Sequence, residues 1–204
     1  MSRLKIRVGL PSVRKQWHPA TIATFESLTK YDKIDFSICK ITGTHCVRAR
    51  NFSAQAVPSS EPALIKQVLP YDYYLSTDDD MAFCPETIER LIAQDKDVIG
   101  AAYPTRDGYP DSLVAAKVGS RGKQDWYKIW DHGLQECDWT GGGCCLIKKE
   151  VFENMEYPYF RNHVICDQGY ADVCTEDISF CFDARKAGYK IWVDLDNRVA
   201  HISN

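Results

Sequence analysis

The stretch YDYYLSTDDDMAF, residues 71–83, decides the fold of this chain. An aromatic and apolar run that ends on three aspartates is typical of a buried strand that stops at the edge of a sheet. Because side chains alternate along a strand, the sequence predicts that Asp78 and Asp80 share one face while Asp79 lies on the other. Two carboxylates on one side repel each other unless a cation lies between them, and oxygen ligands suit Mg²⁺ or Mn²⁺. The alternative is a solvated acidic turn in which Asp79 or Asp80 caps a helix that opens at Pro85.

The segments around this stretch alternate between strand and helix patterns. In the first half, the expected strands are 5–10, 34–41, 72–78 and 97–104, and the expected helices are 20–31, 61–69 and 85–95, with a loop entering a helix at 45–57. This alternation favours βαβ units and a parallel sheet that binds a nucleotide at the carboxyl ends of its strands. In the second half, we expect short antiparallel strands at 112–119 and 126–131, a glycine turn with a strand and a helix start at 139–155, a helix at 175–189 and a strand at 190–202.

Composition limits the classes of protein that this chain can be. Its 204 residues suit one mixed α/β domain, and a net charge of −3 argues against a nucleic-acid-binding protein. The start of the chain reads as an amphipathic strand rather than a signal peptide, and no run approaches the roughly 20 apolar residues of a membrane span. Nine cysteines are scattered without zinc-type spacing, which favours reduced, mostly buried thiols in a cytoplasmic protein.

Four motifs in order make the chain resemble the GT-A glycosyltransferases, which use nucleotide-sugar donors. They are the DxD motif Asp78-Asp79-Asp80, the glycine loop 140–143, the xED motif Thr175-Glu176-Asp177 and a late histidine, His201. The resemblance covers nearly the whole chain. It implies a single GT-A domain with a Rossmann-like, mostly parallel mixed sheet and a small antiparallel element on the acceptor side. Residues 1–103 would form the nucleotide-binding half, and residues 104–204 would form the acceptor-binding half.

The resemblance extends to glycosyltransferase domains encoded by chlorella viruses. It thereby implies that the chain is one domain of a longer polypeptide, located in the host cytoplasm.

The resemblance also implies a metal site. Asp80 would coordinate the metal, Asp78 would reach the ribose or the metal, and Asp79 would lie beside the donor nucleotide. His201 would supply a further ligand, and its imidazole favours Mn²⁺ over Mg²⁺. The metal would bridge the two phosphates and act as a Lewis acid on the leaving nucleotide diphosphate. The alternative for His201 is an exposed residue with no ligand.

The xED motif has two readings. In inverting members of the family the Asp removes the proton of the acceptor hydroxyl, a role that falls here to Asp177, while Glu176 would contact acceptor hydroxyls. In retaining members the motif positions acceptor or donor, so the stereochemical outcome stays open. Thr175 can also cap a helix whose first turn favours acidic residues. Capping and catalysis are compatible, because a capped helix start holds a carboxylate rigidly.

The donor nucleotide is expected to meet two further segments. Pro11, Ser12 and Arg14 lie where the family wraps the nucleobase. Residues 48–51 resemble the family's segment that contacts the uridine, and bidentate arginine suits phosphate and pyrimidine carbonyls. The residues concerned are Arg48, Arg50 and Asn51. The alternative for each arginine is a solvent-facing position on a helix.

The glycine loop is expected to let the backbone approach a ligand, with Gly142 at its centre, or else to form a plain tight turn. Trp139, beside this loop, could stack on a sugar face. For Trp126 and Trp130, half-buried positions in a pair of strands are the expectation.

These patterns together predict a metal-dependent glycosyltransferase. It would move a hexose from a UDP-sugar (UDP-glucose or a related hexose or deoxyhexose) to a carbohydrate acceptor. A sugar-nucleotide nucleotidyltransferase is the second reading, although GLPSVRKQW at 9–17 lacks the glycines that such enzymes usually carry near the first strand. An inactive carbohydrate-binding GT-A domain is the third.

Overall fold

The computed structural model describes residues 3–12, 16–55, 69–106, 111–119, 123–167 and 170–202. The helices are α1 Pro19–Lys30, α2 Cys46–Gln55, α3 Pro85–Ala93, α4 Lys149–Asn154 and α5 Glu176–Lys186. The strands of the main sheet are β1 Leu4–Ser12, β2 Ile34–Thr42, β3 Tyr73–Thr77, β5 Val98–Ala102, β8 Leu134–Cys137, β10 Cys144–Lys148 and β13 Ile191–Arg198. The remaining strands are β4 Met81–Ala82, β6 Ser112–Val118, β7 Gln124–Lys128, β9 Trp139–Thr140, β11 His163–Asp167, β12 Tyr170–Cys174 and β14 Ala200–His201.

The main sheet has seven strands in the order β2-β1-β3-β10-β5-β13-β8. Its pairings are parallel except those made by β10 and β8, so five strands run in one direction. The expected mixed, mostly parallel sheet is therefore confirmed. Because β10 runs antiparallel to β3, with Cys144 opposite Thr77, the glycine loop before β10 lies at the carboxyl end of β3.

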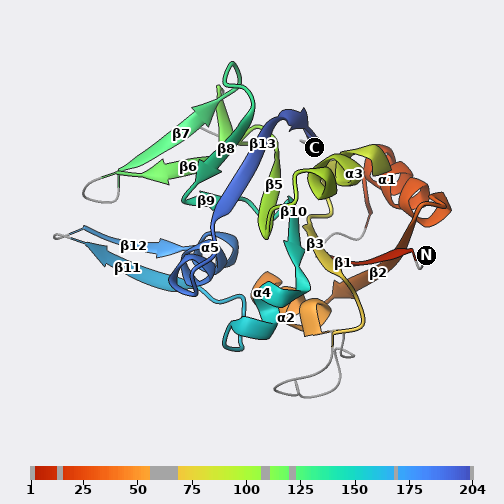
Figure 1. The fold of residues 1–204 in the computed structure, drawn as a ribbon, viewed down its shortest axis with the longest axis horizontal. Coiled ribbons are helices and arrows are strands. Elements are labelled where there is room, and N and C mark those ends of the chain that lie inside the picture. Colours follow the sequence, from red (N-terminus) through yellow and green to blue (C-terminus); the bar gives the residue numbers. More distant parts are fainter. Residues whose placement is uncertain are drawn as a thin grey trace.

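Helices cover both faces of this sheet. One hydrophobic core joins β3, β5, β10 and β13 to α2, α4 and α5, and a second core joins the same sheet to α1 and α3. Figure 1 shows α1 and α3 together on one side and α2 and α4 on the other. Tyr74 and Leu75, both fully buried, are consecutive residues of β3 that enter opposite cores, which is why the strand reads as a continuous apolar run.

Small antiparallel elements extend from the second half of the chain. They are the three-stranded sheet β7-β6-β9, the hairpin β11-β12 and the pair β14-β4, and Figure 1 shows the first two projecting on the same side of the molecule. In the β14–β4 pair, His201 lies opposite Met81. This pairing joins the last described strand to the residue that follows the acidic turn.

Most of the expected elements are present. Most of the expected helix at 61–69 lies outside the described residues. Strands β8 and the β11–β12 hairpin were not expected, because their segments have no clear period of two. The cap of α3 is Cys84, which makes no side-chain capping bond, so the alternative in which Asp79 or Asp80 caps this helix is wrong.

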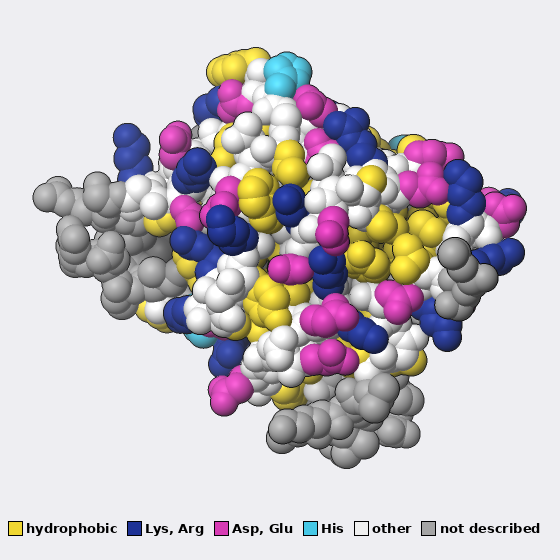
Figure 2. Space-filling view, viewed as in Figure 1, with side chains coloured by type: hydrophobic (Ala, Val, Ile, Leu, Met, Phe, Trp, Pro, Cys, Tyr) yellow, Lys and Arg dark blue, Asp and Glu magenta, His cyan; other side chains and the backbone are white. Residues whose placement is uncertain are grey.

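The distribution of charged side chains and the burial of the cysteines follow the expectations from composition. Figure 2 shows acidic and basic side chains intermixed over the face seen in Figure 1. Side chains are described for eight of the nine cysteines, and five of these eight are buried. No helix in the described ranges has the length and apolar character needed to cross a membrane.

Candidate active site

A cavity of about 450 Å³ opens at the carboxyl ends of β1, β3 and β5. Ligands of open α/β sheets bind at this edge, and small-molecule sites commonly have volumes of about 300–1,000 Å³. Seven of the residues predicted from the sequence line this cavity: Pro11, Ser12, Asp78, Asp79, Asp80, Asp177 and His201. Four distant segments of the chain therefore converge on one space.

The acidic motif forms a turn rather than the end of a strand. β3 ends at Thr77, and Asp79 and Asp80 lie in the turn that leads to β4. The alternation of side chains stops there, so the prediction that Asp79 faces away from its neighbours is wrong. All three aspartates line the cavity. Asp79 is only 7% exposed, and its Oδ2 accepts a hydrogen bond of 2.8 Å from the Ser12 hydroxyl, which ties the turn to the end of β1.

Arg50 joins the two acidic motifs. Its side chain, 2% exposed, places Nη2 2.6 Å from Asp78 Oδ1 and Nε 3.0 Å from Glu176 Oε1. Nη1 also donates to the Ser76 hydroxyl and to the Gly142 carbonyl oxygen. Burial alone would lower the pKa of Arg50, but the neighbouring charges, Asp78 first, raise it well above its usual value. The solvent-facing alternative for this residue is wrong, and its guanidinium is engaged by protein groups rather than turned to the place expected for the uridine.

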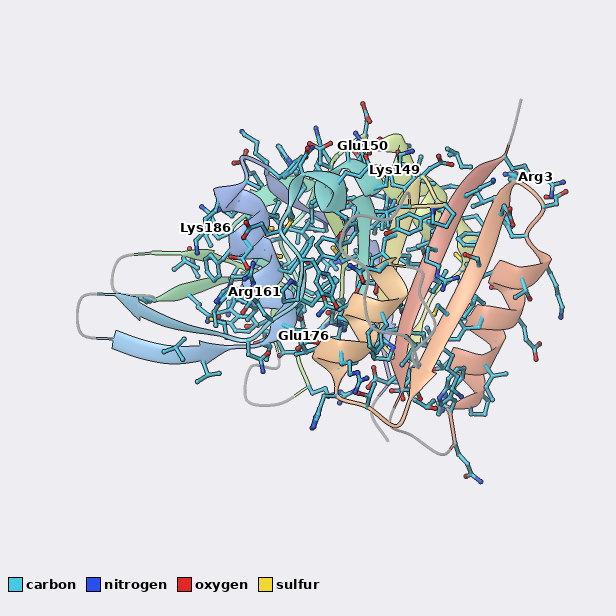
Figure 3. The ribbon with its side chains drawn as sticks, turned by 90° about the horizontal axis from the view of Figure 1, so that it is seen from below. Arg3, Lys149, Glu150, Arg161, Glu176 and Lys186 are labelled. Atoms are coloured by element: carbon cyan, nitrogen blue, oxygen red, sulfur yellow. The ribbon has the colours of Figure 1, made fainter. Side chains whose placement is uncertain are left out.

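Glu176 is the first residue of α5, and its side chain reaches α2, the helix that carries Arg50 (Figure 3). Its Oε1 also accepts a bond of 2.9 Å from the Cys46 thiol, and its side chain is 14% exposed. Although burial acts to raise it, the Arg50 guanidinium lowers the pKa of Glu176. Burial raises the pKa of Cys46 to about 12, so this thiol at the cavity wall is a hydrogen-bond donor and not a thiolate nucleophile. Glu176 is not among the described residues that line the cavity, and its contact with the acceptor stays a prediction.

Asp177 faces the cavity with its carboxylate fixed in place. Oδ2 accepts from the Gly142 backbone N–H at 3.0 Å, and Oδ1 accepts from the Thr175 hydroxyl at 2.5 Å and from the Ile178 N–H at 2.9 Å. Thr175 occupies the cap position of α5 but orients this carboxylate instead of capping the helix with its side chain. Burial, and next the Glu176 carboxylate, raise the pKa of Asp177 above its usual value. A raised pKa makes a carboxylate a stronger base, which suits proton abstraction.

The glycine loop makes room for protein side chains. A Cβ on Gly142 would lie 2.9 Å from Arg50 Nη2 and 3.2 Å from the Asp177 Cβ. A Cβ on Gly141 or Gly143 would collide with Tyr103, whose hydroxyl accepts a bond of 2.9 Å from the Gly143 N–H. The expectation that these glycines admit a ligand is therefore corrected, because protein groups occupy the space beside each of them. The backbone of Gly142 positions two side chains: its carbonyl oxygen accepts a hydrogen bond from Arg50, and its N–H donates one to Asp177.

His201 reaches the acidic turn through the β14–β4 pairing. Its Nε2 lies 3.7 Å from Asp80 Oδ1, its Nδ1 lies 3.1 Å from the Pro104 carbonyl oxygen, and its ring meets Tyr103 edge-on. The side chain is 13% exposed, so the alternative of an exposed residue is wrong. Arg106, which was not expected here, lines the cavity and forms an ion pair with Asp80 Oδ2.

These contacts test whether the residues fit a divalent metal. No three His, Cys, Asp or Glu side chains within the described ranges form a metal-binding group, so the expected set of Asp78, Asp80 and His201 is not seen as a triad. Asp78 is paired with Arg50 instead. Asp80 and His201 do fit as a pair, because Mg²⁺ and Mn²⁺ keep several waters and take substrate phosphates beside one or two protein ligands. The Arg106 guanidinium on Asp80 already shows that this carboxylate holds a positive charge.

Three further residues were predicted to meet the donor nucleotide: Asn51, Arg48 and Arg14. Asn51 is 3% exposed, and its amide makes bonds with Val47 and with both backbone groups of Phe160, so it fixes α2 and does not line the cavity. Arg48 is exposed, with its guanidinium over the Phe52 ring. Arg14 lies outside the described residues.

The half-buried position expected for Trp126 in a pair of strands is confirmed. The same expectation is wrong for Trp130, which is 61% exposed and lies in a turn. Trp139 is 1% exposed, so stacking on a sugar is excluded for it. Trp126 lines the cavity beside Val114 and packs edge-on against Trp139, with 4.9 Å between ring centroids. Both lie on the sheet β7-β6-β9. Ala116 on β6, the middle strand, pairs with Trp126 on β7 and with Trp139 on β9. The sequence does not show this, because burial of each ring depends on the pairing of β7 and β9 with β6, which are separated along the chain.

Comparison with known proteins identifies solved structures with a similar fold. No protein-family model matches this chain, and no curated protein matches its sequence. Among solved structures, A197 from STIV is similar with 15% identity and a TM-score of 0.58, over 100% of this chain and 95% of that one. GalNAc-T7, solved with UDP, GalNAc and Mn²⁺, is similar with 12% identity and a TM-score of 0.59, over 99% of this chain and 44% of that one.

A third similar structure is the catalytic domain of Drosophila β1,4-galactosyltransferase 7 in complex with xylobiose. It shares 15% identity and a TM-score of 0.54, over 98% of this chain and 71% of that one. At such identities the likeness concerns the fold. Together with the sheet order and the helices on both faces, it shows that this chain has the GT-A fold.

Proposed function

We propose that this chain is a metal-dependent glycosyltransferase that moves a hexose from a UDP-sugar to a carbohydrate acceptor. The observation that carries the proposal is the convergence of the acidic turn 78–80, Asp177 and His201 on one cavity. The GalNAc-T7 structure of the same fold contains UDP, GalNAc and Mn²⁺, which supports a nucleotide-sugar donor and a divalent cation here as well.

The donor would occupy the end of the cavity formed by β1 and the acidic turn. Pro11, Ser12 and Thr44 line this end and suit the nucleoside. Asp80 and His201 would hold a divalent cation, with Mn²⁺ the first choice because one ligand is an imidazole. When bound, this cation would supply Lewis-acid stabilisation to the leaving diphosphate. Asp78, held by Arg50, would keep its position beside the ribose.

The acceptor would occupy the opposite end, between Asp177 and the wall formed by Val114 and Trp126. An indole ring offers an apolar face to a sugar ring, and the packing of Trp126 against Trp139 fixes its orientation. Asp177 would accept the proton of the attacking hydroxyl. Its bonds from Thr175 and Gly142 hold the carboxylate for that role without rearrangement.

Release of UDP from a panel of UDP-sugars, measured with and without Mn²⁺, tests the proposal. We expect release that requires Mn²⁺ and rises when a carbohydrate acceptor is added. Asp80→Asn should abolish it, because the diphosphate loses its cation, and His201→Ala should raise the Mn²⁺ concentration needed for half-activity. A matched control is Asp125→Asn, an exposed carboxylate of β7 outside the described lining, which should behave as wild type.

Other outcomes identify the competing functions. Release of pyrophosphate from a nucleoside triphosphate and a sugar phosphate would indicate a nucleotidyltransferase. Binding of UDP-sugar or glycan without turnover would indicate an inactive carbohydrate-binding domain. Metal-independent UDP release that Asp80→Asn leaves unchanged would contradict the role given to the acidic turn.

The pH profile provides a further prediction about Asp177. The base must be ionised, so activity should fall as pH drops through its raised pKa. Glu176→Gln removes the negative charge that helps to raise this pKa, and it leaves the Arg50 charge, which lowers the pKa, less neutralised. Both effects act in the same direction, so the acid limb of kcat/KM should move to lower pH in the variant. A limb that stays in place or moves to higher pH would contradict this assignment.

A further inference from the structure

Arg106 lies on the segment that follows β5, at the wall of the cavity. Its guanidinium forms an ion pair with Asp80 Oδ2, and its side chain is 44% exposed while that of Asp80 is 4% exposed. We propose that Arg106 holds Asp80 in the nucleotide-free protein, is displaced from it by the divalent cation, and then binds the donor diphosphate. This inference rests on the proposed function and assigns a role to a residue outside the four motifs.

Arg106 and a divalent cation compete for the same carboxylate. One oxygen of Asp80 is paired with Arg106, and the other lies 3.7 Å from the His201 Nε2 that would share the metal. A guanidinium and a divalent cation on one carboxylate repel each other, and the carboxylate concerned is only 4% exposed. Binding of the metal at Asp80 therefore weakens the ion pair with Arg106 and favours departure of the guanidinium.

The displaced guanidinium has a binding partner in the donor. Among the described residues that line the cavity, Arg106 is the only lysine or arginine. Arg48 and Arg50, the arginines expected at the donor, do not line it. A guanidinium binds phosphate oxygens in a bidentate manner and stays charged at every relevant pH.

The backbone of this segment is already anchored, so the exchange needs only the side chain to move. Pro104 bridges to Leu113 on β6, and the Thr105 N–H donates to the Ser112 carbonyl oxygen at 3.0 Å. The long arginine side chain can rotate from Asp80 toward the open cavity while these bonds persist. Arg106 therefore exchanges one anionic partner for another as the donor enters.

Titration of Mn²⁺, with free Mn²⁺ followed by electron paramagnetic resonance, tests this directly and needs no turnover. We expect Arg106→Gln to bind Mn²⁺ about 5- to 10-fold more tightly than wild type when no nucleotide is present, since the competing charge is gone. With UDP present, the same variant should bind the Mn²⁺–UDP complex about 10-fold more weakly, because the phosphates lose an arginine. The opposite signs of the two effects distinguish this role from a merely structural one.

Two further variants serve as controls. Arg185→Gln changes an arginine of similar exposure, 41%, that is paired with Asp138 outside the described cavity lining, so it should change neither affinity. Arg106→Lys keeps the charge but not the fork of donors, so it should retain most of the competition with Mn²⁺ and lose part of the affinity for UDP.

Three results would overturn the inference. Equal Mn²⁺ affinity in wild type and Arg106→Gln without nucleotide would show that the arginine does not compete. Weaker Mn²⁺ binding by the variant would show that Arg106 supports the metal site instead. If neither protein binds Mn²⁺, with or without UDP, the metal dependence in the proposed function fails too, whereas the first two results leave that function intact.

Discussion

Asp177→Asn should lower turnover by about 10²- to 10⁴-fold, the loss typical of removing a general base. Asparagine is nearly isosteric, so its side-chain oxygen can still accept from the Thr175 hydroxyl and from the Ile178 N–H, while its amide nitrogen replaces the oxygen that accepts from the Gly142 N–H and loses that bond. Affinity for the donor should therefore be close to wild type, while transfer to the acceptor is lost. The measurement is kcat for sugar transfer beside the dissociation constant of UDP in the presence of Mn²⁺.

The anomeric configuration of the product decides what the result means. An inverted product, seen by NMR of the anomeric proton, agrees with direct proton removal by Asp177. A retained product would assign Asp177 to positioning of the donor or acceptor. Unchanged turnover in Asp177→Asn would exclude both roles.

Arg50→Ala should lower the free energy of unfolding by about 3 kcal/mol, at the lower end for breaking a buried ion pair, because Asp78 is 36% exposed. The substitution leaves the Asp78 and Glu176 carboxylates next to each other without their shared cation. Urea denaturation measures the change. Activity should fall as well, because the two motifs that meet at the cavity lose their common anchor.

Two variants complete this test. Arg50→Lys keeps the charge but cannot bond Asp78, Glu176 and the Gly142 carbonyl oxygen at once, so it should recover part of the stability and little of the activity. Arg48→Ala, two residues away on α2, removes an exposed guanidinium over the Phe52 ring and should cost less than about 1 kcal/mol. If Arg50→Ala and Arg48→Ala unfold at the same urea concentration, the buried pairs contribute nothing to stability.

The succession of strands and helices was predictable because it depends on local pattern. The apolar run of β3 must be buried on both faces, and the alternation of strand and helix before it favours a parallel sheet. Pro85 starts α3, and Gly188, with φ of +94°, ends the last helix in a backbone conformation that glycine adopts without strain. The resemblance then pointed to the GT-A fold and to seven of the fourteen described residues that line the cavity.

The partner of each side chain was not predictable from local pattern. The local pattern predicts that the acidic motif ends a strand, but the chain turns after Thr77, and this brings Asp79 into the site with its neighbours. Arg50 and Asn51 were expected at the donor because of the motif, yet their neighbours are 26 to 126 residues away for Arg50 and as far as 109 for Asn51. A helix sequence does not reveal which of its polar residues will meet buried carboxylates.

By itself, the sequence determined the class of the fold and the set of motifs, because hydrophobic periodicity and turn residues act over a few positions. Only the tertiary structure decided that Arg50 links the two acidic motifs, that Arg106 lies on Asp80, and that Trp126 rather than Trp139 faces the cavity. The physical reason is that charge pairing and ring packing depend on distances between segments far apart in the chain. Those distances are set only when the sheet order, the antiparallel β10 and the pairing of β6 with β7 and β9 are in place.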